Sequence, residues 1–294
     1  MPKYYKRWWK AILIGKNGKG NLIYAIDKPF FTKCKDSLNL HVFDEKGKVV
    51  MNILSIGNSF SKDAQRYLHQ IAKADDVVLN VFNLYISGCP LSTHYRNVLS
   101  EERAYMLEMN GVSTGFKVSL KEALLNRDWD IVTVQQASRL SPDDATYQPY
   151  LNNLVQYVRD CVPKAKIVVH QTWAYEQGCQ RLNVELQYLD YKDMLRDVVA
   201  AYQKAANDIG ADFIIPSGEV FDALLENGIE KIHRDTYHAS LGLGRYALGL
   251  TWYRFLTGND ISDNTFACFD EDVSAEQMVI AKKCVSQIAD QYGV

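Results

Sequence analysis

The chain has 294 residues, of which 47% are hydrophobic and 23% charged, and its formal net charge is −2. This length can bury a large core, and the nearly neutral balance favours neither nucleic acid nor an anionic membrane as a partner. The charge is nevertheless uneven, because residues 1–50 hold 11 Lys/Arg against 4 Asp/Glu while residues 51–294 hold 22 against 31.

The basic segment 1–50 is expected to be an appendage to a single domain at 51–294, or translated sequence upstream of the natural start. Its longest early apolar stretch has four residues, which is too short for a signal-peptide core or a membrane span. The alternative is a small β-rich extension, in which apolar runs at 38–43 and 49–50 flank a turn at 45–47.

The cysteines are widely scattered and show no spacing typical of a metal site. Since no export signal or transmembrane segment is evident, we expect a cytoplasmic protein whose thiols are reduced. We also expect no metal and no cofactor, because neither a phosphate-binding loop nor a metal cluster is apparent. The cysteines are Cys34, Cys89, Cys161, Cys179, Cys268 and Cys284.

From residue 51 onward, strand-like and helix-like segments alternate. The predicted strands are 52–56, 77–86, 129–135, 167–170 and 213–215, and 104–109 with 115–118 forms a predicted hairpin around an Asn-Gly turn. The predicted helices are 63–74, 95–102, 120–126, 150–161, 188–209, 220–226, 241–256 and 275–291.

Strands separated by helices predict βαβ units and a parallel sheet with right-handed crossovers. In such α/β folds the functional sites form at the carboxyl ends of the strands. Ser59, Gly88 and the pair Gln135 and Gln136 all lie just past predicted strand ends. The pattern therefore predicts that these residues meet at one edge of the sheet.

Ser59 follows an apolar strand and a Gly-Asn turn, and Asp235 and His238 lie three positions apart far downstream. Serine, histidine and aspartate together can form an activated nucleophile, in which the imidazole removes the hydroxyl proton and the carboxylate orients the imidazole. The alternatives are a serine that caps the following helix and an Asp–His pair that is purely structural. The second glycine of the Gly-x-Ser-x-Gly elbow is missing, which disfavours an ordinary α/β-hydrolase.

The segment Gly-Asn-Ser-Phe-Ser at 57–61, a glycine after the second strand and Asp-x-x-His before a late helix resemble the SGNH (GDSL-type) hydrolase superfamily. Segments 86–94 and 129–138 are similar to an uncharacterised branch of it, and the resemblance covers residues 51–258. It implies a three-layer α/β/α sandwich with a flavodoxin-like parallel sheet, and ester hydrolysis without a cofactor.

The resemblance also implies roles for individual residues. Ser59 would be the nucleophile, His238 the general base and then acid, and Asp235 the carboxylate that orients the histidine. Asn58 stands where the name-giving motif has Asp, a position that is not the acid of the triad. The backbone N–H groups of Ser59 and Gly88 would form two parts of the oxyanion hole.

The third part of that oxyanion hole is usually an asparagine from a Gly-x-Asn-Asp motif, which is absent here. Gln135 and Gln136 occupy its place, and a glutamine amide can donate the same hydrogen bond on a longer arm. The sequence does not separate the two. Further candidates for lining the substrate site, equally compatible with core packing, are His94, Tyr95, Trp173 and Tyr175.

These observations favour a serine esterase that removes small acyl groups, such as acetyl, through an acyl-enzyme, and whose substrate is a small-molecule or glycan ester. A thioesterase or lipid esterase is the alternative within enzymes. A glycan-binding module that keeps the fold without catalysis is the alternative from another class, motivated by the missing asparagine. The substrate follows from fold-level analogy alone, and the oligomeric state is left open.

Overall fold

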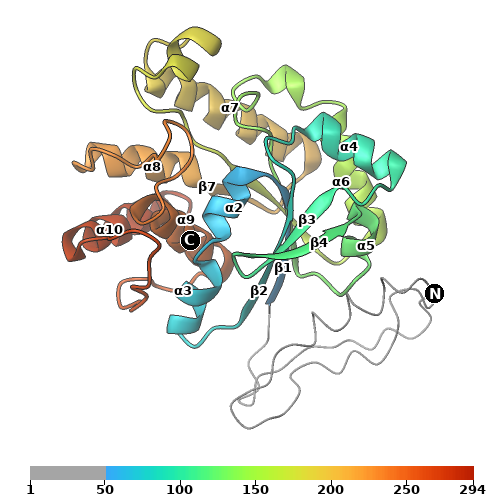
Figure 1. The fold of residues 1–294 in the computed structure, drawn as a ribbon, viewed down its shortest axis with the longest axis horizontal. Coiled ribbons are helices and arrows are strands. Elements are labelled where there is room, and N and C mark those ends of the chain that lie inside the picture. The colour runs from blue at the N-terminus through green and yellow to red at the C-terminus, as the bar shows by residue number, and fades with distance from the viewer. Residues whose placement is uncertain (1–50) are drawn as a thin grey trace.

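A computed structural model of the chain describes residues 51–294, so the predictions for segment 1–50 lie outside the described residues. The centre is one seven-stranded sheet with the order β4-β3-β2-β1-β5-β6-β7 (Figure 1). Five strands are parallel, whereas β3 and β4 form an antiparallel hairpin at one edge. The strands are β1 (Met51–Gly57), β2 (Leu79–Tyr85), β3 (Tyr105–Met109), β4 (Val112–Val118), β5 (Ile131–Val134), β6 (Lys166–Gln171) and β7 (Phe213–Pro216).

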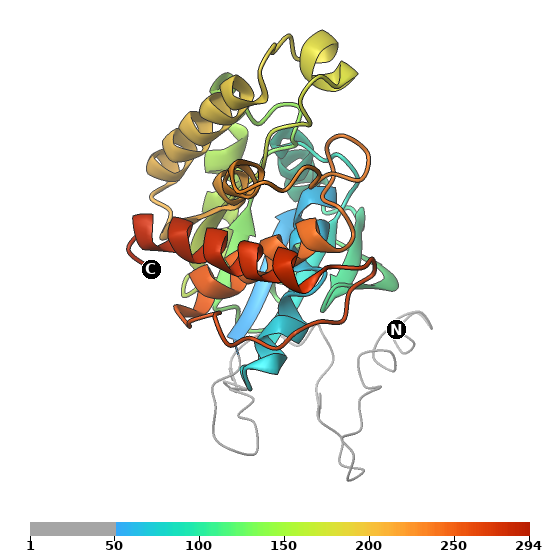
Figure 2. The same cartoon turned by 90° about the vertical axis from the view of Figure 1, so that its left-hand side faces the viewer.

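Helices cover both faces of this sheet, which gives three layers (Figures 1 and 2). One layer contains α2 (Ser59–Gln65), α3 (Leu68–Ala74), α8 (Ser217–Glu226), α9 (Leu243–Thr257) and α10 (Ala275–Gln291). The other contains α4 (Leu91–Ser100), α5 (Leu120–Leu124), α6 (Tyr150–Cys161) and α7 (Tyr191–Ile209). The predicted α/β/α fold class is therefore confirmed.

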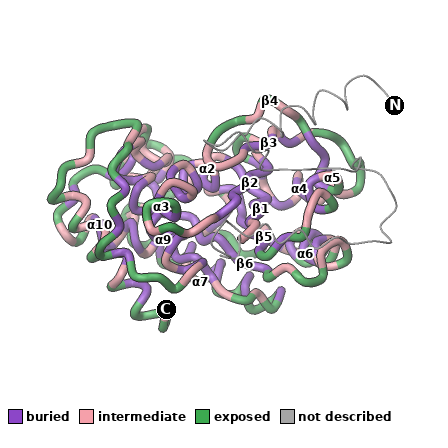
Figure 3. The backbone as a smooth tube through the Cα atoms, turned by 90° about the horizontal axis from the view of Figure 1, so that it is seen from below, coloured by how far each residue is buried: buried purple, intermediate pink, exposed green. Residues whose placement is uncertain are grey.

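The central strands are buried on both faces, as expected for parallel strands between two helical layers (Figure 3). The edge strand β4 is largely exposed. In the helical layer beside α2, Gly249 of α9 lies so close to α3 that an added Cβ would be 2.7 Å from Ile71 Cδ1. The small residues of α9 thus permit a close approach between helices.

Most predicted elements lie within a few residues of the observed ones, but the single helix predicted at 63–74 is wrong. The chain instead forms α2 and α3, with a break at Arg66 and Tyr67. Both residues bind distant loops: Arg66 forms a two-point ion pair with Asp270, and the Tyr67 hydroxyl donates to Leu241 O at 2.6 Å. Because these contacts are long-range, no local pattern predicts them.

The hairpin turn between β3 and β4 was predicted correctly from the sequence. The hairpin turn has Asn110 and Gly111 at φ values of 51° and 78°, as its Asn-Gly sequence predicts. Two short helical turns, η1 (Asp144–Thr146) and η2 (Arg181–Glu185), were not predicted. Within residues 51–294, no helix is long and apolar enough to cross a membrane, and the five cysteines there form no disulfide.

Candidate active site

Ser59 is the first residue of α2, directly after the carboxyl end of β1. The cap of this helix is Asn58, whose side-chain Oδ1 accepts the N–H of Phe60 at 3.0 Å. The capping role considered for Ser59 therefore belongs to Asn58, and the Ser59 hydroxyl is left for another partner. We call residues 57–59 the serine turn.

A buried polar chain supports the serine turn from below. The Ser61 hydroxyl accepts the N–H of Asn58 at 3.1 Å and lies 2.8 Å from Asn83 Oδ1 on β2. Asn83 in turn donates to Glu108 Oε2 at 2.8 Å, and Lys62 Nζ lies 2.7 Å from Glu108 Oε1. Because Glu108 is buried on β3, its charge needs these partners, and the chain ties the serine turn to the hairpin.

Gly57 makes this arrangement possible. A Cβ at this position would lie 2.1 Å from Ser61 Oγ, a distance that no side chain tolerates. The φ angle of Gly57 is not positive, so backbone conformation does not require a glycine here. The glycine is required because the turn is closely packed around it.

Ser59, His238 and Asp235 come together as the sequence predicts. His238 Nε2 lies 2.8 Å from Ser59 Oγ, and His238 Nδ1 lies 2.8 Å from Asp235 Oδ2. The other carboxylate oxygen of Asp235 accepts the backbone N–H of His238 at 2.9 Å. With Nδ1–H donated to the carboxylate, Nε2 is free to accept the hydroxyl proton.

Asp235 is suited to stay ionised in this arrangement. Partial burial acts to raise the pKa of Asp235, but hydrogen bonds from the side chain and backbone of His238 outweigh it and hold the pKa below its ordinary value. A carboxylate that remains charged at neutral pH can keep the imidazole in one tautomer and stabilise the imidazolium that forms on proton transfer.

Residues 233–239, which we call the histidine loop, are held by two separate parts of the molecule, α2 and the segment after β6. Arg234 donates to both carboxylate oxygens of Asp63 in α2, at 3.1 and 2.9 Å. Trp173 Nε1 donates to the carbonyl of Tyr237 at 2.8 Å, and Thr236 O accepts the N–H of Glu176 at 2.8 Å. Sequence reasoning gave Arg234 and Asp63 no role, because two charges 171 positions apart carry no shared local signal.

The backbone N–H groups of Ser59 and Gly88 are open at this site. Neither has a hydrogen-bond acceptor among residues 51–294. Gly88 adopts a φ of +58°, and its neighbours fix it beside the serine turn: Ile86 N–H donates to Gly57 O, and Asn58 Nδ2 donates to Cys89 O at 3.2 Å. Two unpaired donors near one hydroxyl can stabilise a developing oxyanion.

The structure separates the two glutamines. Gln135 Nε2 donates to Asn58 Oδ1 at 2.8 Å, so its amide lies against the serine turn and keeps a second N–H for another acceptor. Gln136 faces elsewhere: its Oε1 accepts the N–H of Leu91 at 3.0 Å, and its Nε2 donates to Thr146 O at 3.1 Å. Gln135 is therefore the glutamine that lies against the serine turn.

His170 at the end of β6 holds Gln135 from behind. Its Nδ1 lies 2.7 Å from Gln135 Oε1 and its Nε2 lies 3.1 Å from Ser217 Oγ. Burial lowers the pKa of His170 to about 3, so the ring is neutral at physiological pH and has one N–H to give. Sequence reasoning missed this residue; its signal was a histidine near the end of an otherwise apolar strand.

Two of the candidate lining residues have no exposed surface. His94 is fully buried, with its Nδ1 3.1 Å from the hydroxyl of Tyr105. Trp173 is fully buried beneath Phe60, with ring centres 4.2 Å apart. Neither side chain is open to a ligand in this conformation, and Trp173 supports the histidine loop from the core.

The other two candidates differ in position. Tyr95 is partly exposed on α4 and packs toward Tyr150, with ring centres 6.5 Å apart. Tyr175 belongs to the surroundings of His238, since its ring meets that of Tyr237 edge-on at 5.6 Å and its hydroxyl lies 2.9 Å from Ser138 Oγ. Tyr175 is only 2% exposed, so like Trp173 it packs beneath the histidine loop.

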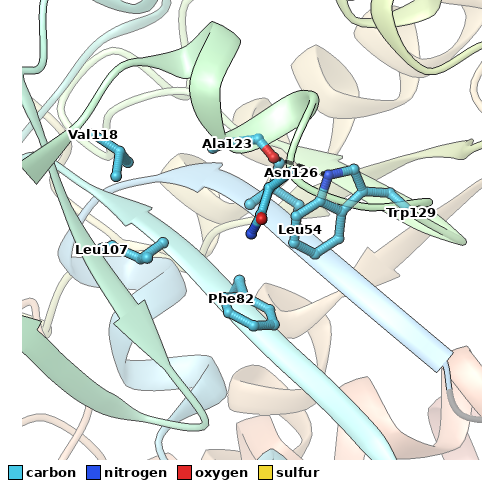
Figure 4. A pocket seen from close by; sticks show the side chains of 7 residues that line it. All are labelled: Leu54, Phe82, Leu107, Val118, Ala123, Asn126 and Trp129. Atoms are coloured by element: carbon cyan, nitrogen blue, oxygen red, sulfur yellow. Dashed lines mark hydrogen bonds between the residues drawn. The ribbon is translucent and has the colours of Figure 1, made fainter. Parts of the chain in front are cut away.

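A small cavity lies elsewhere, between the sheet, the hairpin and α5 (Figure 4). It offers about 10 Å³ and is lined mainly by apolar side chains, among them Leu54, Phe82 and Trp129. This is about the volume of one water molecule, which would find few polar partners there. None of the predicted site residues lines the cavity, and it is a packing defect.

No curated protein matches this chain. A solved structure of a DUF4886 family protein from Bacteroides uniformis is 31% identical, with a TM-score of 0.76 over 83% of this chain and 96% of that one. A protein from Slackia heliotrinireducens described as a candidate SGNH hydrolase is 22% identical, with a TM-score of 0.51 over 70% of this chain and 99% of that one.

The second of these likenesses concerns the fold, which is that of SGNH hydrolases, as the sequence resemblance implied. The family model described as a domain of unknown function, DUF4886, matches residues 52–288. That range includes the serine turn, Gly88, Gln135 and the histidine loop. The chain therefore belongs to the DUF4886 family.

Proposed function

We propose that this protein is a serine ester hydrolase that acts through an acyl-enzyme. The observation that carries the proposal is the 2.8 Å contact between His238 Nε2 and Ser59 Oγ, with Asp235 on the other ring nitrogen. In the first step His238 takes the hydroxyl proton while Ser59 Oγ attacks the ester carbonyl. The carbonyl oxygen becomes an oxyanion that the N–H groups of Ser59 and Gly88 face.

The tetrahedral intermediate then collapses. His238, now an imidazolium, gives its proton to the leaving alcohol oxygen, and the acyl group remains on Ser59. A water molecule enters where the alcohol left, loses a proton to His238 and attacks the acyl carbonyl. The second tetrahedral intermediate then releases the carboxylic acid, and His238 returns its proton to Ser59 Oγ. Asp235 stabilises the imidazolium in both half-reactions. The second N–H of Gln135 is the proposed third donor to the oxyanion.

We further propose that the acyl group is small, with acetyl esters of carbohydrates as the first class to examine. The rings of Phe60, next to Ser59 in the sequence, and Trp173 support this, since both are at most 2% exposed and stack on each other instead of lining a groove. A long acyl chain needs an extended apolar groove. A thioesterase or lipid esterase is the rival, and a series of 4-nitrophenyl esters of increasing chain length separates them: a preference for long chains contradicts the proposal.

The chemistry is tested with 4-nitrophenyl acetate on the wild type, Ser59→Ala and His238→Ala. We expect both variants to lose turnover by at least ~1,000-fold, because nucleophile and base act as one unit. Equal turnover in all three proteins contradicts the proposal. A non-catalytic glycan-binding module is the other candidate, and it would leave Ser59 unlabelled by a fluorophosphonate probe.

A further inference from the structure

Two arginine side chains lie beside the candidate active site without a carboxylate partner. Arg139, in the loop after β5, donates from Nη1 to the carbonyl of Gly88 at 3.3 Å. Arg181, at the start of η2, lies with its guanidinium carbon 4.0 Å from the ring centre of Tyr237. Within residues 51–294, neither guanidinium forms an ion pair, whereas Arg234 of the histidine loop is paired with a buried carboxylate.

Arg181 lies on the His238 side of the site, whereas Arg139 contacts it from the Gly88 side. The ring centre of Tyr237 is 4.0 Å from that of His238, so Tyr237 contacts both His238 and the guanidinium group of Arg181. Tyr175 meets Tyr237 edge-on at 5.6 Å. Burial raises the pKa of Tyr175, and the positive charges of both Arg181 and Arg139 act against that rise, as expected if both guanidinium groups lie near the one phenol.

The chemistry of the reaction decides which part of a substrate these groups would meet. His238 gives its proton to the leaving alcohol oxygen, so the side chains around its ring face the alcohol portion of the ester. A guanidinium group binds carboxylate, sulfate and phosphate through charge-assisted, often two-point hydrogen bonds. Glu176, which follows Tyr175, forms no ion pair with either arginine among the described residues, and so does not satisfy them.

We propose that Arg139 and Arg181 select esters whose alcohol portion carries an anionic group, such as an O-acetylated acidic sugar. The inference rests on the proposed ester hydrolysis and narrows its substrate class. Arg139 reaches the site from the Gly88 side and Arg181 from the Tyr237 side, so an anion held between them is fixed relative to the scissile bond. Binding of this kind positions the substrate for attack.

The test compares 3-acetoxybenzoate with its neutral counterpart 3-acetoxybenzamide on the wild type, Arg139→Gln and Arg181→Gln. Each substitution should lower kcat/KM for the anion about 10-fold, mainly through KM, and change the amide less than about 2-fold. Arg196→Gln, which removes a charge from the surface of α7, is the matched control and should change neither. For each ester, kcat/KM of the variant is divided by that of the wild type. The different intrinsic reactivities of the two esters therefore do not affect the comparison.

Equal losses on both esters, or no loss on either, overturn the inference. A third ester, 3-acetoxybenzenesulfonate, distinguishes a site for carboxylates from one for sulfonates and sulfates. Binding can be measured without catalysis. 3-Acetoxybenzoate is titrated into the Ser59→Ala variant and into the Ser59→Ala, Arg181→Gln double variant, and ligand-observed NMR gives the dissociation constant for each. If the wild type hydrolyses no ester but affinity still falls about 10-fold, the proposed function fails and the anion site stands; an unchanged affinity refutes the anion site.

Discussion

Arg234 binds both carboxylate oxygens of Asp63, and this contact joins the helix that begins at Ser59 to the loop that carries His238. Asp63 is one turn beyond Ser59 in α2 and is fully buried, and Arg245 from α9 donates to it at 2.9 Å. Arg234 directly precedes Asp235. The ion pair therefore fixes the distance between the proposed nucleophile and its base.

We expect Asp63→Asn to lower kcat by more than 10-fold while KM changes little, because the histidine loop loses its attachment to α2. The free energy of unfolding should fall by about 3–5 kcal/mol, since two guanidinium groups lose their buried partner. Urea unfolding and steady-state kinetics measure the two effects. Arg66→Gln is the control, because it breaks the more exposed pair with Asp270; an equal loss of kcat there would show that Asp63 has no special positioning role.

Asp235→Asn should lower kcat by ~1,000-fold or more and leave the fold intact. An amide at this position can no longer hold the Nδ1–H tautomer of His238 as a carboxylate does. The reaction of Ser59 with a fluorophosphonate probe should slow in parallel. If labelling and turnover both persist at wild-type rates, another group orients the histidine.

Substitutions of Gln135 and Gln136 should have different effects on kcat. Gln135→Ala is expected to reduce kcat by ~100-fold with little change in KM, because the amide beside the serine turn stabilises only the oxyanion. Gln136→Ala should instead lower the melting temperature and largely preserve kcat, because its amide ties the start of α4 to Thr146. The reverse pattern would assign the third oxyanion donor to Gln136.

Stability should fall steeply as the pH drops below 6.5. Burial lowers the pKa of His94 to about 3, of His170 to about 3 and of His233 to about 4, against 6.5 as the ordinary value. Between about pH 6.5 and pH 4, the unfolded chain binds up to three more protons than the folded protein. For each of these protons, the free energy of unfolding falls by about 1.4 kcal/mol per pH unit. Above pH 6.5 both states are neutral at these rings, and this dependence ends.

Urea unfolding at about pH 7, 6 and 5 measures the proton uptake through the slope of stability against pH. In His94→Gln the slope should be smaller by about one proton, whatever the variant's overall stability. An unchanged slope would mean that His94 is already protonated in the folded protein.

The sequence predicted the sheet because its strands are short apolar runs separated by helical periodicity, and that information is local. It also predicted Ser59 with His238, because their neighbours match a family pattern. The predicted helix began at residue 63, four residues after the observed start of α2 at Ser59, because the first turn of α2 shows no helical periodicity of apolar residues. The distinction between Gln135 and Gln136 could not be read either: adjacent residues past a strand end point in opposite directions, and which one meets Asn58 depends on contacts with β6 and the loop at Thr146.

The same limit applies to the groups that hold the site. Arg234 and Asp63, or His170 and Gln135, meet only after the chain has folded, and each is an ordinary polar residue in its own segment. His170 and Gln135 meet because the order of the strands places β5 beside β6, whereas Arg234 reaches Asp63 from the loop between α8 and α9.

The antiparallel hairpin at the edge of the sheet has a bearing on protein engineering. Glu108 on β3 accepts a hydrogen bond from Asn83 and forms an ion pair with Lys62. Through Asn83 and Ser61 it supports Asn58. A minimised protein trimmed to the parallel strands would thus leave a lysine and an amide facing solvent in place of a carboxylate, and would loosen the turn that presents Ser59. The hairpin belongs to any transplantable unit built from this site.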